Sequence, residues 1–170
     1  MQHLPDGKYW DVLYKAGGGL LDYGWRSNLI VDQCRELLAA FMLGDAASGI
    51  QEIRLGRGQT SWDSASPPAT NPGISALTDT SPVTIGAGSL QLEYIDAVGG
   101  ISTTPGHRIQ VTLTLTSGVL PISGGDVFPL REFALFGELA GNPCMIDYVR
   151  HPVMNIAADD TLVRRIRLVF

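Results

Sequence analysis

The chain has 170 residues, of which 45% are hydrophobic, 17% are charged, 20 are Gly and 10 are Pro. This composition excludes a coiled coil, a collagen and a fully disordered chain. The length suits one domain with a core large enough to fold without a disulfide or a metal. Twelve Lys and Arg against seventeen Asp and Glu give a net charge of -5, which argues against broad binding to nucleic acid or to anionic membranes.

Aromatic residues gather at the start of the chain and flank a glycine run at residues 17–19. They show no period of 2 or 3.6, so they need a surface to bury against, either the chain's own domain or a neighbouring subunit. We therefore predict an aromatic N-terminal arm over residues 1–26 and a β domain over residues 27–170. The candidate subunit-interface residues of the arm are Tyr9, Trp10, Tyr14, Tyr23 and Trp25.

One helix is predicted over residues 28–43, because apolar side chains recur there at steps of three and four. Asn28 or Ser27 can cap its start, and Gly44 can end it in the left-handed conformation. A strand at residues 50–56 follows, and residues 57–82 then indicate a long loop in which Ile74 and Leu77 dip into the core. Loops of this length are usually functional or docked on something.

Beyond the loop the pattern is that of strands, which alternate apolar and polar residues. The fold class that follows is mainly β, an antiparallel β-sandwich or barrel-like sheet with one N-terminal helix packed on it. Arg164 lies on the mainly apolar side of the last strand, as a rim residue, a surface strand end or half of an interface ion pair. We count it as a candidate interface residue. The predicted strands cover residues 90–96, 108–116, 130–137, 145–150 and 162–170.

The sequence offers little support for a catalytic, metal-binding, cofactor-binding or membrane-spanning motif. No Gly-x-Ser-x-Gly turn is present, and the three His residues lack ligand spacing. Cys34 and Cys144 are far apart and are interpreted as buried, reduced thiols. Asp159 and Asp160 favour a turn over a calcium site. No apolar run reaches the length of a transmembrane helix, and no signal peptide is indicated. We expect no enzyme, no cofactor and no metal.

Several short motifs occur in an order that resembles a known family. They are WRSNLIV at residues 25–31, IRLGRG at 53–58, SALTDT at 75–80, PLREFALFG at 129–137 and IRLVF at 166–170. Together they resemble the tail-associated structural proteins of tailed phages, which also occur in phage-tail-like contractile injection systems. The resemblance implies a non-enzymatic virion component of a baseplate, fibre base, neck or collar, made in the host cytoplasm.

The same resemblance implies the partners. They are other copies of the chain, in a homo-oligomer or ring, and other tail, baseplate or neck proteins, with no direct contact to nucleic acid or membrane. The alternative is a carbohydrate- or receptor-binding β module of a tail fibre. Trp62, beside Asp63 and Ser64 in the long loop, is its best candidate for stacking on a sugar ring, and Tyr94 is another. Trp62 completes the set of candidate interface residues.

Overall fold

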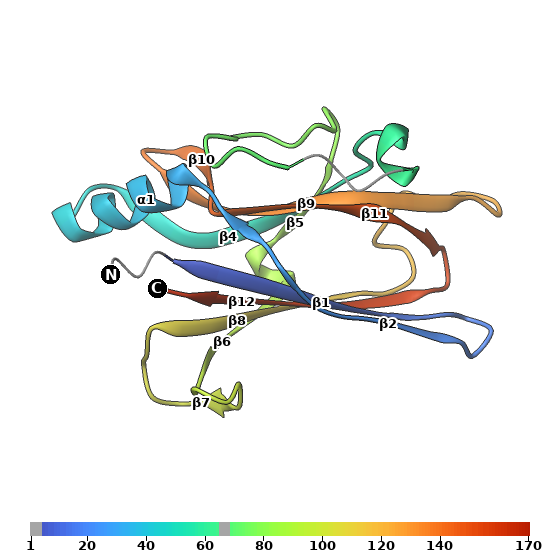
Figure 1. Cartoon of the computed structure of the whole chain (residues 1–170), viewed down its shortest axis with the longest axis horizontal. Helices are drawn as coiled ribbons and strands as arrows, with labels where there is room; N and C mark the ends of the chain where they lie inside the picture. The colour runs from blue at the N-terminus through green and yellow to red at the C-terminus, as the bar shows by residue number, and fades with distance from the viewer. Residues whose placement is uncertain (1–4, 65–68) are drawn as a thin grey trace. The chain divides into compact units, whose positions relative to one another are not determined.

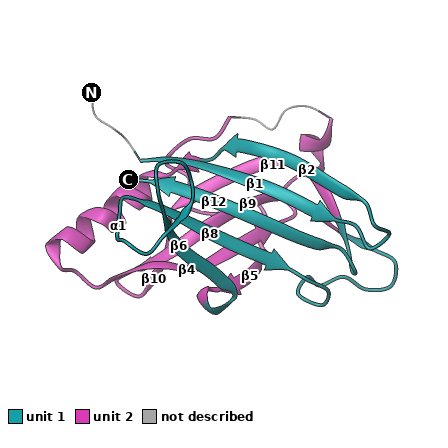
Figure 2. Cartoon of the chain, turned by 90° about the horizontal axis from the view of Figure 1, so that it is seen from below, with its two compact units in different colours: residues 1–28, 88–127, 156–170 teal, residues 29–87, 128–155 magenta. Residues whose placement is uncertain are grey.

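The structure, a computed structural model, describes residues 5–64 and 69–170. Two compact units, each with a sheet, are built from interleaved parts of the chain (Figure 1). Unit one takes residues 1–28, 88–127 and 156–170, and unit two takes residues 29–87 and 128–155 (Figure 2). The division differs from the predicted arm and domain, because strands from both ends of the chain meet in one sheet.

Unit one is a six-stranded sheet in the order β2-β1-β12-β8-β6-β7, and all its pairs are antiparallel. The longest pair joins the first and the last strand over nine positions, from Asp6 opposite Val169 to Tyr14 opposite Thr161. The strands are β1 (Asp6–Tyr14), β2 (Leu20–Ser27), β6 (Leu90–Ile95), β7 (Ile101–Ser102), β8 (Arg108–Leu115) and β12 (Thr161–Val169).

The predicted arm at residues 1–26 is therefore wrong for the residues that the structure describes, because they form the β1–β2 hairpin of this sheet. The glycine run is the turn of the hairpin, closed by a hydrogen bond of 2.8 Å from the Lys15 amide to the Gly19 carbonyl. The sequence of this hairpin does not show the apolar–polar alternation of a strand for two reasons. The register shifts between Trp10 and Val12, and β2 is exposed over most of its length.

Unit two has the strand order β3-β11-β9-β4-β5, and β10 pairs with β9 as a hairpin. A buried cluster at its centre includes Val31, Phe136 and Tyr148, and Ile74 and Leu77 of the long loop pack against it, as predicted. The elements are β3 (Leu29–Ile30), α1 (Asp32–Leu43), β4 (Ala47–Gly56), the 3-10 helix η1 (Thr60–Asp63), β5 (Val83–Gly86), the 3-10 helix η2 (Ala87–Ser89) between the units in sequence, β9 (Val127–Leu139), β10 (Asn142–Met145) and β11 (Asp147–Ala157).

The helix begins four residues later than predicted. Its N-cap is Val31, because Leu29 and Ile30 pair with β11 as the short strand β3. Gly44 ends it in the left-handed conformation, with φ 77°, as predicted. The helix packs beside β10, where the Cys144 thiol donates to the Gln33 carbonyl at 3.3 Å.

The prediction of a mainly β, antiparallel protein with a single helix is confirmed. Neither sheet closes into a barrel, since the first ends at β2 and β7 and the second at β3 and β5. Among the described residues, no helix has both the length and the apolar character needed to cross a membrane.

Gly137 in β9 lies where the neighbouring backbone comes too close for a side chain. An added Cβ would stand 2.7 Å from the Ser48 carbonyl oxygen and 2.8 Å from that of Gly49. We expect Gly137→Ala to lower the free energy of unfolding by about 1–3 kcal/mol, because the β4 backbone has to move. Urea unfolding measures this. Gly86→Ala is the control, since its Cβ would meet nothing within 4 Å; an equal loss in both variants would contradict the prediction.

Candidate functional site

A buried ion pair links the neighbouring strands β1 and β12 of unit one. Arg164 Nε and Nη2 donate to the two carboxylate oxygens of Asp11, both at 2.7 Å. The side chains are 0% and 2% exposed. The two residues are direct cross-strand partners of β12 and β1. Arg164 was predicted as an interface residue; it pairs instead inside its own chain, because the register of β1 sets Asp11 opposite it.

Tyr9 lies on the same buried face of the sheet, with its ring 5.9 Å from the Arg164 guanidinium. Burial raises the pKa of the Tyr9 hydroxyl, and this outweighs the opposite effect of Arg164. Tyr9 is therefore part of the interior of the protein rather than an exposed anchor, which corrects its prediction as an interface residue.

The end of the β1–β2 hairpin is tied to the turn before β12. Lys15 Nζ donates to Asp160 Oδ2 at 2.7 Å, and the Ala16 and Ala157 amides donate to the same carboxylate. Burial by itself would raise the pKa of Asp160, but these hydrogen bonds prevail and lower it. Asp160 is a turn residue, as the sequence indicated.

The opposite face of this sheet carries a row of aromatic and cationic side chains. The rings of Trp10 and Trp25, which are cross-strand partners, lie 5.6 Å apart. The Arg167 guanidinium lies 4.4 Å from the centre of the Trp25 ring and the Lys8 ammonium 5.0 Å. Arg165 stands in the same way 5.1 Å from the Trp10 ring. Such stacking is favourable because the ring face is electronegative.

The other aromatic residues of the hairpin are separate from this row. Tyr14 is exposed at the end of β1, beside exposed Leu20 and Leu21 at the start of β2. Tyr23 is partly buried, and Arg26 lies 5.7 Å from the centre of its ring. The five aromatic residues predicted as one interface are thus divided among a buried face, an exposed face and the hairpin end. No single surface gathers them.

In unit two, Arg131 of β9 holds the first part of the long loop. Its Nε and Nη2 donate to the two carboxylate oxygens of Asp63 in η1, both at 2.7 Å, and Nη1 donates to the Arg57 carbonyl at 2.9 Å. Hydrogen bonding from Arg131 lowers the pKa of Asp63. This bidentate pairing fixes where the loop leaves β4.

The next residue, Glu132, holds the last part of the loop. Its fully buried carboxylate accepts the Thr78 amide at 3.0 Å and the Asp79 amide at 2.6 Å, and the Tyr148 hydroxyl donates to it. Burial first, and then the hydrogen bond to Glu132, raise the pKa of Tyr148 to about 12. Gly56 lies opposite Glu132 in β4 and leaves room for it, since a Cβ there would stand 2.6 Å from Oε1.

Trp62 is a buried anchor of the same loop rather than an exposed ring. Its side chain is 4% exposed, and the Arg150 guanidinium lies 4.8 Å from the ring centre. The left-handed Gly58, with φ 53°, leaves the space that the Trp62 ring fills. The prediction of Trp62 as an interface or sugar-stacking residue is therefore wrong, because its ring fills the space beside Gly58 and is covered by Arg150. Tyr94 of β6 does remain exposed.

Both cysteines are buried and free, as predicted. Burial raises the pKa of Cys34 to about 11, so the thiol stays protonated at neutral pH. Within residues 5–64 and 69–170, no group of three or more His, Cys, Asp or Glu side chains is placed to hold a metal ion.

Comparison with known proteins gives no assignment: no family model matches the chain, and neither a curated protein nor a solved structure is significantly similar to it. The geometry therefore carries the functional argument. Most polar contacts hold chain segments in place, and the row of Trp, Lys and Arg side chains on unit one is the face on which cations are gathered.

The Asp11–Arg164 pair gives a direct test of the interior of unit one. We expect Asp11→Asn to lower the free energy of unfolding by about 3–5 kcal/mol, because it leaves a buried guanidinium without its countercharge. Asp32→Asn is the control, since Asp32 pairs with Arg35 on the exposed side of α1 and should change stability by less than about 1 kcal/mol. Urea unfolding of both variants decides; similar losses would refute the buried pair.

The Glu132 contacts give a second test. We expect Glu132→Gln to speed amide hydrogen exchange at Thr78 and Asp79 and to cost about 1–3 kcal/mol, because one buried acceptor oxygen is replaced by a donor. The measurement is hydrogen exchange followed by mass spectrometry. Glu138→Gln, at an exposed position of the same strand, should leave the loop unchanged. Unaltered exchange in Glu132→Gln would show that the carboxylate does not hold the loop.

Proposed function

We propose that this protein is a non-enzymatic structural component of a phage tail or of a related contractile injection machine. It acts at a baseplate, fibre-anchoring or neck position and holds neighbouring subunits together within the particle. The order of the five short motifs supports this proposal. The structural role of one motif, PLREFALFG, supports it as well. Its residues Arg131 and Glu132 hold both parts of the long loop on the β core.

The observation that carries the proposal is the large apolar side chains left exposed at two places. At the end of α1, Phe41 is exposed, Met42 is 89% exposed and Leu43 is 79% exposed. At the β1–β2 hairpin, Tyr14, Leu20 and Leu21 are exposed together. Contiguous apolar patches on a folded protein mark surfaces that partners cover.

The outer strand of unit one supports the same function. β2 is the edge of its sheet and is exposed along most of its eight residues. An open edge offers unpaired backbone groups to a strand from another subunit. In a ring of identical subunits, one surface of each copy meets a different surface of the next, and the hairpin and the helix end provide two such surfaces.

The alternative is a carbohydrate- or receptor-binding module of a tail fibre. Its main candidate ring, Trp62, is covered by Arg150, which weakens it. Exposed Tyr94 and the partly exposed Trp25 still favour it to a lesser extent. A glycan array therefore accompanies the test of assembly.

We expect the protein to sediment with tail particles produced from the complete set of tail genes, at a constant copy number per particle. Density-gradient centrifugation followed by quantitative peptide mass spectrometry measures this. The double change Met42→Ser with Leu43→Ser should reduce the particle-bound fraction about tenfold or more without lowering stability, because it removes apolar surface that a neighbour covers.

Val119→Ser is the matched control, since Val119 is an exposed apolar residue that belongs to unit one and not to the helix. It should leave the particle-bound fraction unchanged. A wild-type chain that stays in the particle-free fractions would refute the assembly role, and selective glycan binding in that case would favour the fibre-module alternative.

A further inference from the structure

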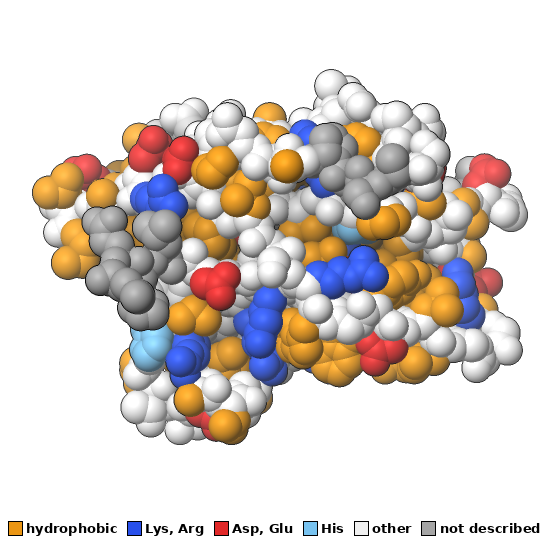
Figure 3. All heavy atoms as spheres, viewed as in Figure 1, with side chains coloured by type: hydrophobic (Ala, Val, Ile, Leu, Met, Phe, Trp, Pro, Cys, Tyr) orange, Lys and Arg blue, Asp and Glu red, His pale blue; other side chains and the backbone are white. Residues whose placement is uncertain are grey.

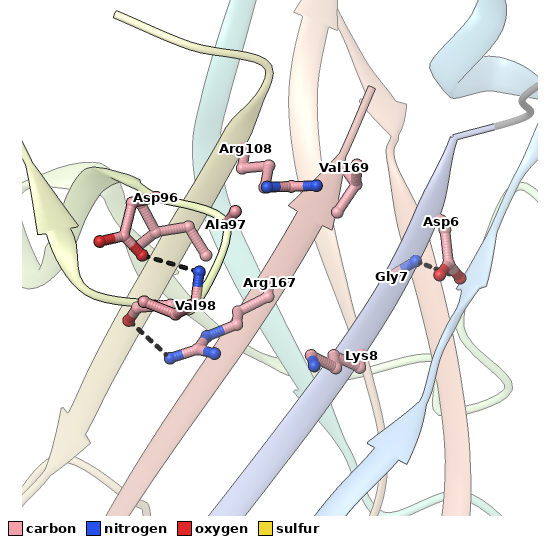
Figure 4. A pocket seen from close by; sticks show the side chains of 11 residues that line it. Asp6, Gly7, Lys8, Asp96, Ala97, Val98, Arg108, Arg167 and Val169 are labelled. Carbon is pink, nitrogen blue, oxygen red and sulfur yellow. Dashed lines mark hydrogen bonds between the residues drawn. The ribbon is translucent and has the colours of Figure 1, made fainter. Parts of the chain in front are cut away.

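A pocket of about 270 Å³ opens on the same face of unit one as the row of Trp, Lys and Arg side chains. Three neighbouring strands contribute a cation to its lining, Lys8 from β1, Arg167 from β12 and Arg108 from β8 (Figure 4). The last residue of β6 and the turn that follows it, residues 95–99, form the opposite side. Lys8 and Arg167 are cross-strand partners, so the sheet register sets these two cations side by side.

Most of the cations that form no ion pair within the described residues lie on this face or line its pocket. Six of the twelve Lys and Arg side chains form an ion pair with a carboxylate of the described residues. Among the others, Lys8, Arg108, Arg165 and Arg167 all belong to this face or its pocket. Figure 3 shows Lys and Arg side chains at two places in the lower left of its view, and others elsewhere on the molecule. A chain of net charge -5 thus places four of its six cations without an ion pair on one face of unit one.

The two acids that line the pocket are engaged by their own backbone. Asp96 Oδ1 accepts the Val98 amide at 2.9 Å and the Gly100 amide at 2.8 Å, and these bonds lower the pKa of Asp96. Asp6 Oδ1 accepts the Gly7 amide at 2.8 Å. Asp96 also attracts Arg108 and Arg167, yet the pocket keeps an excess of cations over acids, three to two.

Arg167 is held in place before any ligand arrives. Its Nε donates to Gln110 Oε1 at 2.9 Å and its Nη2 to the Gly99 carbonyl at 3.0 Å, while Trp25 stacks on the guanidinium. Gly99 has φ 91° and lies against the guanidinium, where a Cβ has no room. A fixed, partly desolvated arginine favours a planar anion such as a carboxylate, because little side-chain freedom remains to be lost on binding.

We propose that this pocket binds a carboxylate side chain within an acidic segment of a neighbouring protein subunit. The proposal rests on the assembly role above and names the chemistry of one partner. The cationic surface continues past the pocket to Arg165 over Trp10, two residues further along β1 and β12 from the Lys8–Arg167 pair. An extended row of this kind suits a run of acidic residues better than one free anion or one sugar, since each acid meets its own cation.

The test uses a fluorescently labelled hexaglutamate peptide and fluorescence anisotropy. We expect saturable binding that weakens as salt is raised, because exposed charges are screened. Arg167→Gln and Arg108→Gln should each weaken binding about tenfold or more, since each removes one charge-assisted contact. Arg35→Gln, the same change on exposed α1 of unit two, is the control and should bind as the wild type does. Urea unfolding verifies that each variant is folded. If Arg167→Gln does not fold, Arg108→Gln still tests the pocket.

Three results would overturn the pocket: no binding of hexaglutamate by the wild type, equal weakening in Arg35→Gln, or binding of sodium glucuronate or inorganic phosphate in preference to the peptide. The last would assign the pocket to a sugar acid or a free anion. The two proposals fail separately. Assembly into particles without binding of the peptide would support the assembly role and refute the proposed pocket. Binding of the peptide without entry into particles would support the pocket and refute the assembly role.

Discussion

The pairing of β1 with β12 is the constraint on which unit one depends. Nine consecutive residue pairs join the two ends of the chain, and their register decides which side chains meet. It sets Asp11 opposite Arg164 on the buried face, and Lys8 opposite Arg167 on the other. A shift of one residue would turn every side chain of β1 to the opposite face, which would leave a buried guanidinium without its carboxylate. The buried ion pair and the cationic pocket are therefore two results of one register.

Unit two shows how a β core can hold a long segment that has little regular structure of its own. Successive residues of a strand point to opposite sides, so Arg131 and Glu132 reach the loop in two different directions. Arg131 fixes the part near Asp63, and Glu132 fixes the part near Asp79. The buried groups involved are all hydrogen-bonded, which is the condition under which a buried polar network adds order to a protein.

The few charged side chains of the chain are unevenly distributed in this structure. Half of its cations pair with acids inside their own unit, as Arg131 and Arg164 do, and four of the rest share one face of unit one. Apolar side chains are left exposed at the end of α1 and at the β1–β2 hairpin. A protein with separate cationic and apolar surfaces suits an assembly in which different neighbours cover each of them.

Elements with a local pattern could be predicted from the residues alone: alternation at residues 108–116 and 162–170 predicted strands, and Gly44 predicted the end of the helix. The loop was also predictable, including the packing of the partly buried Ile74 and Leu77 against the core. Three features became known from the three-dimensional contacts: the aromatic N-terminal segment is a hairpin of the sheet, Arg164 pairs with Asp11, and Trp62 is buried against Arg150. They could not be predicted because the residues that meet are far apart along the chain. Asp11 and Arg164 are 153 residues apart, and no local pattern records which of many possible registers brings two such residues together.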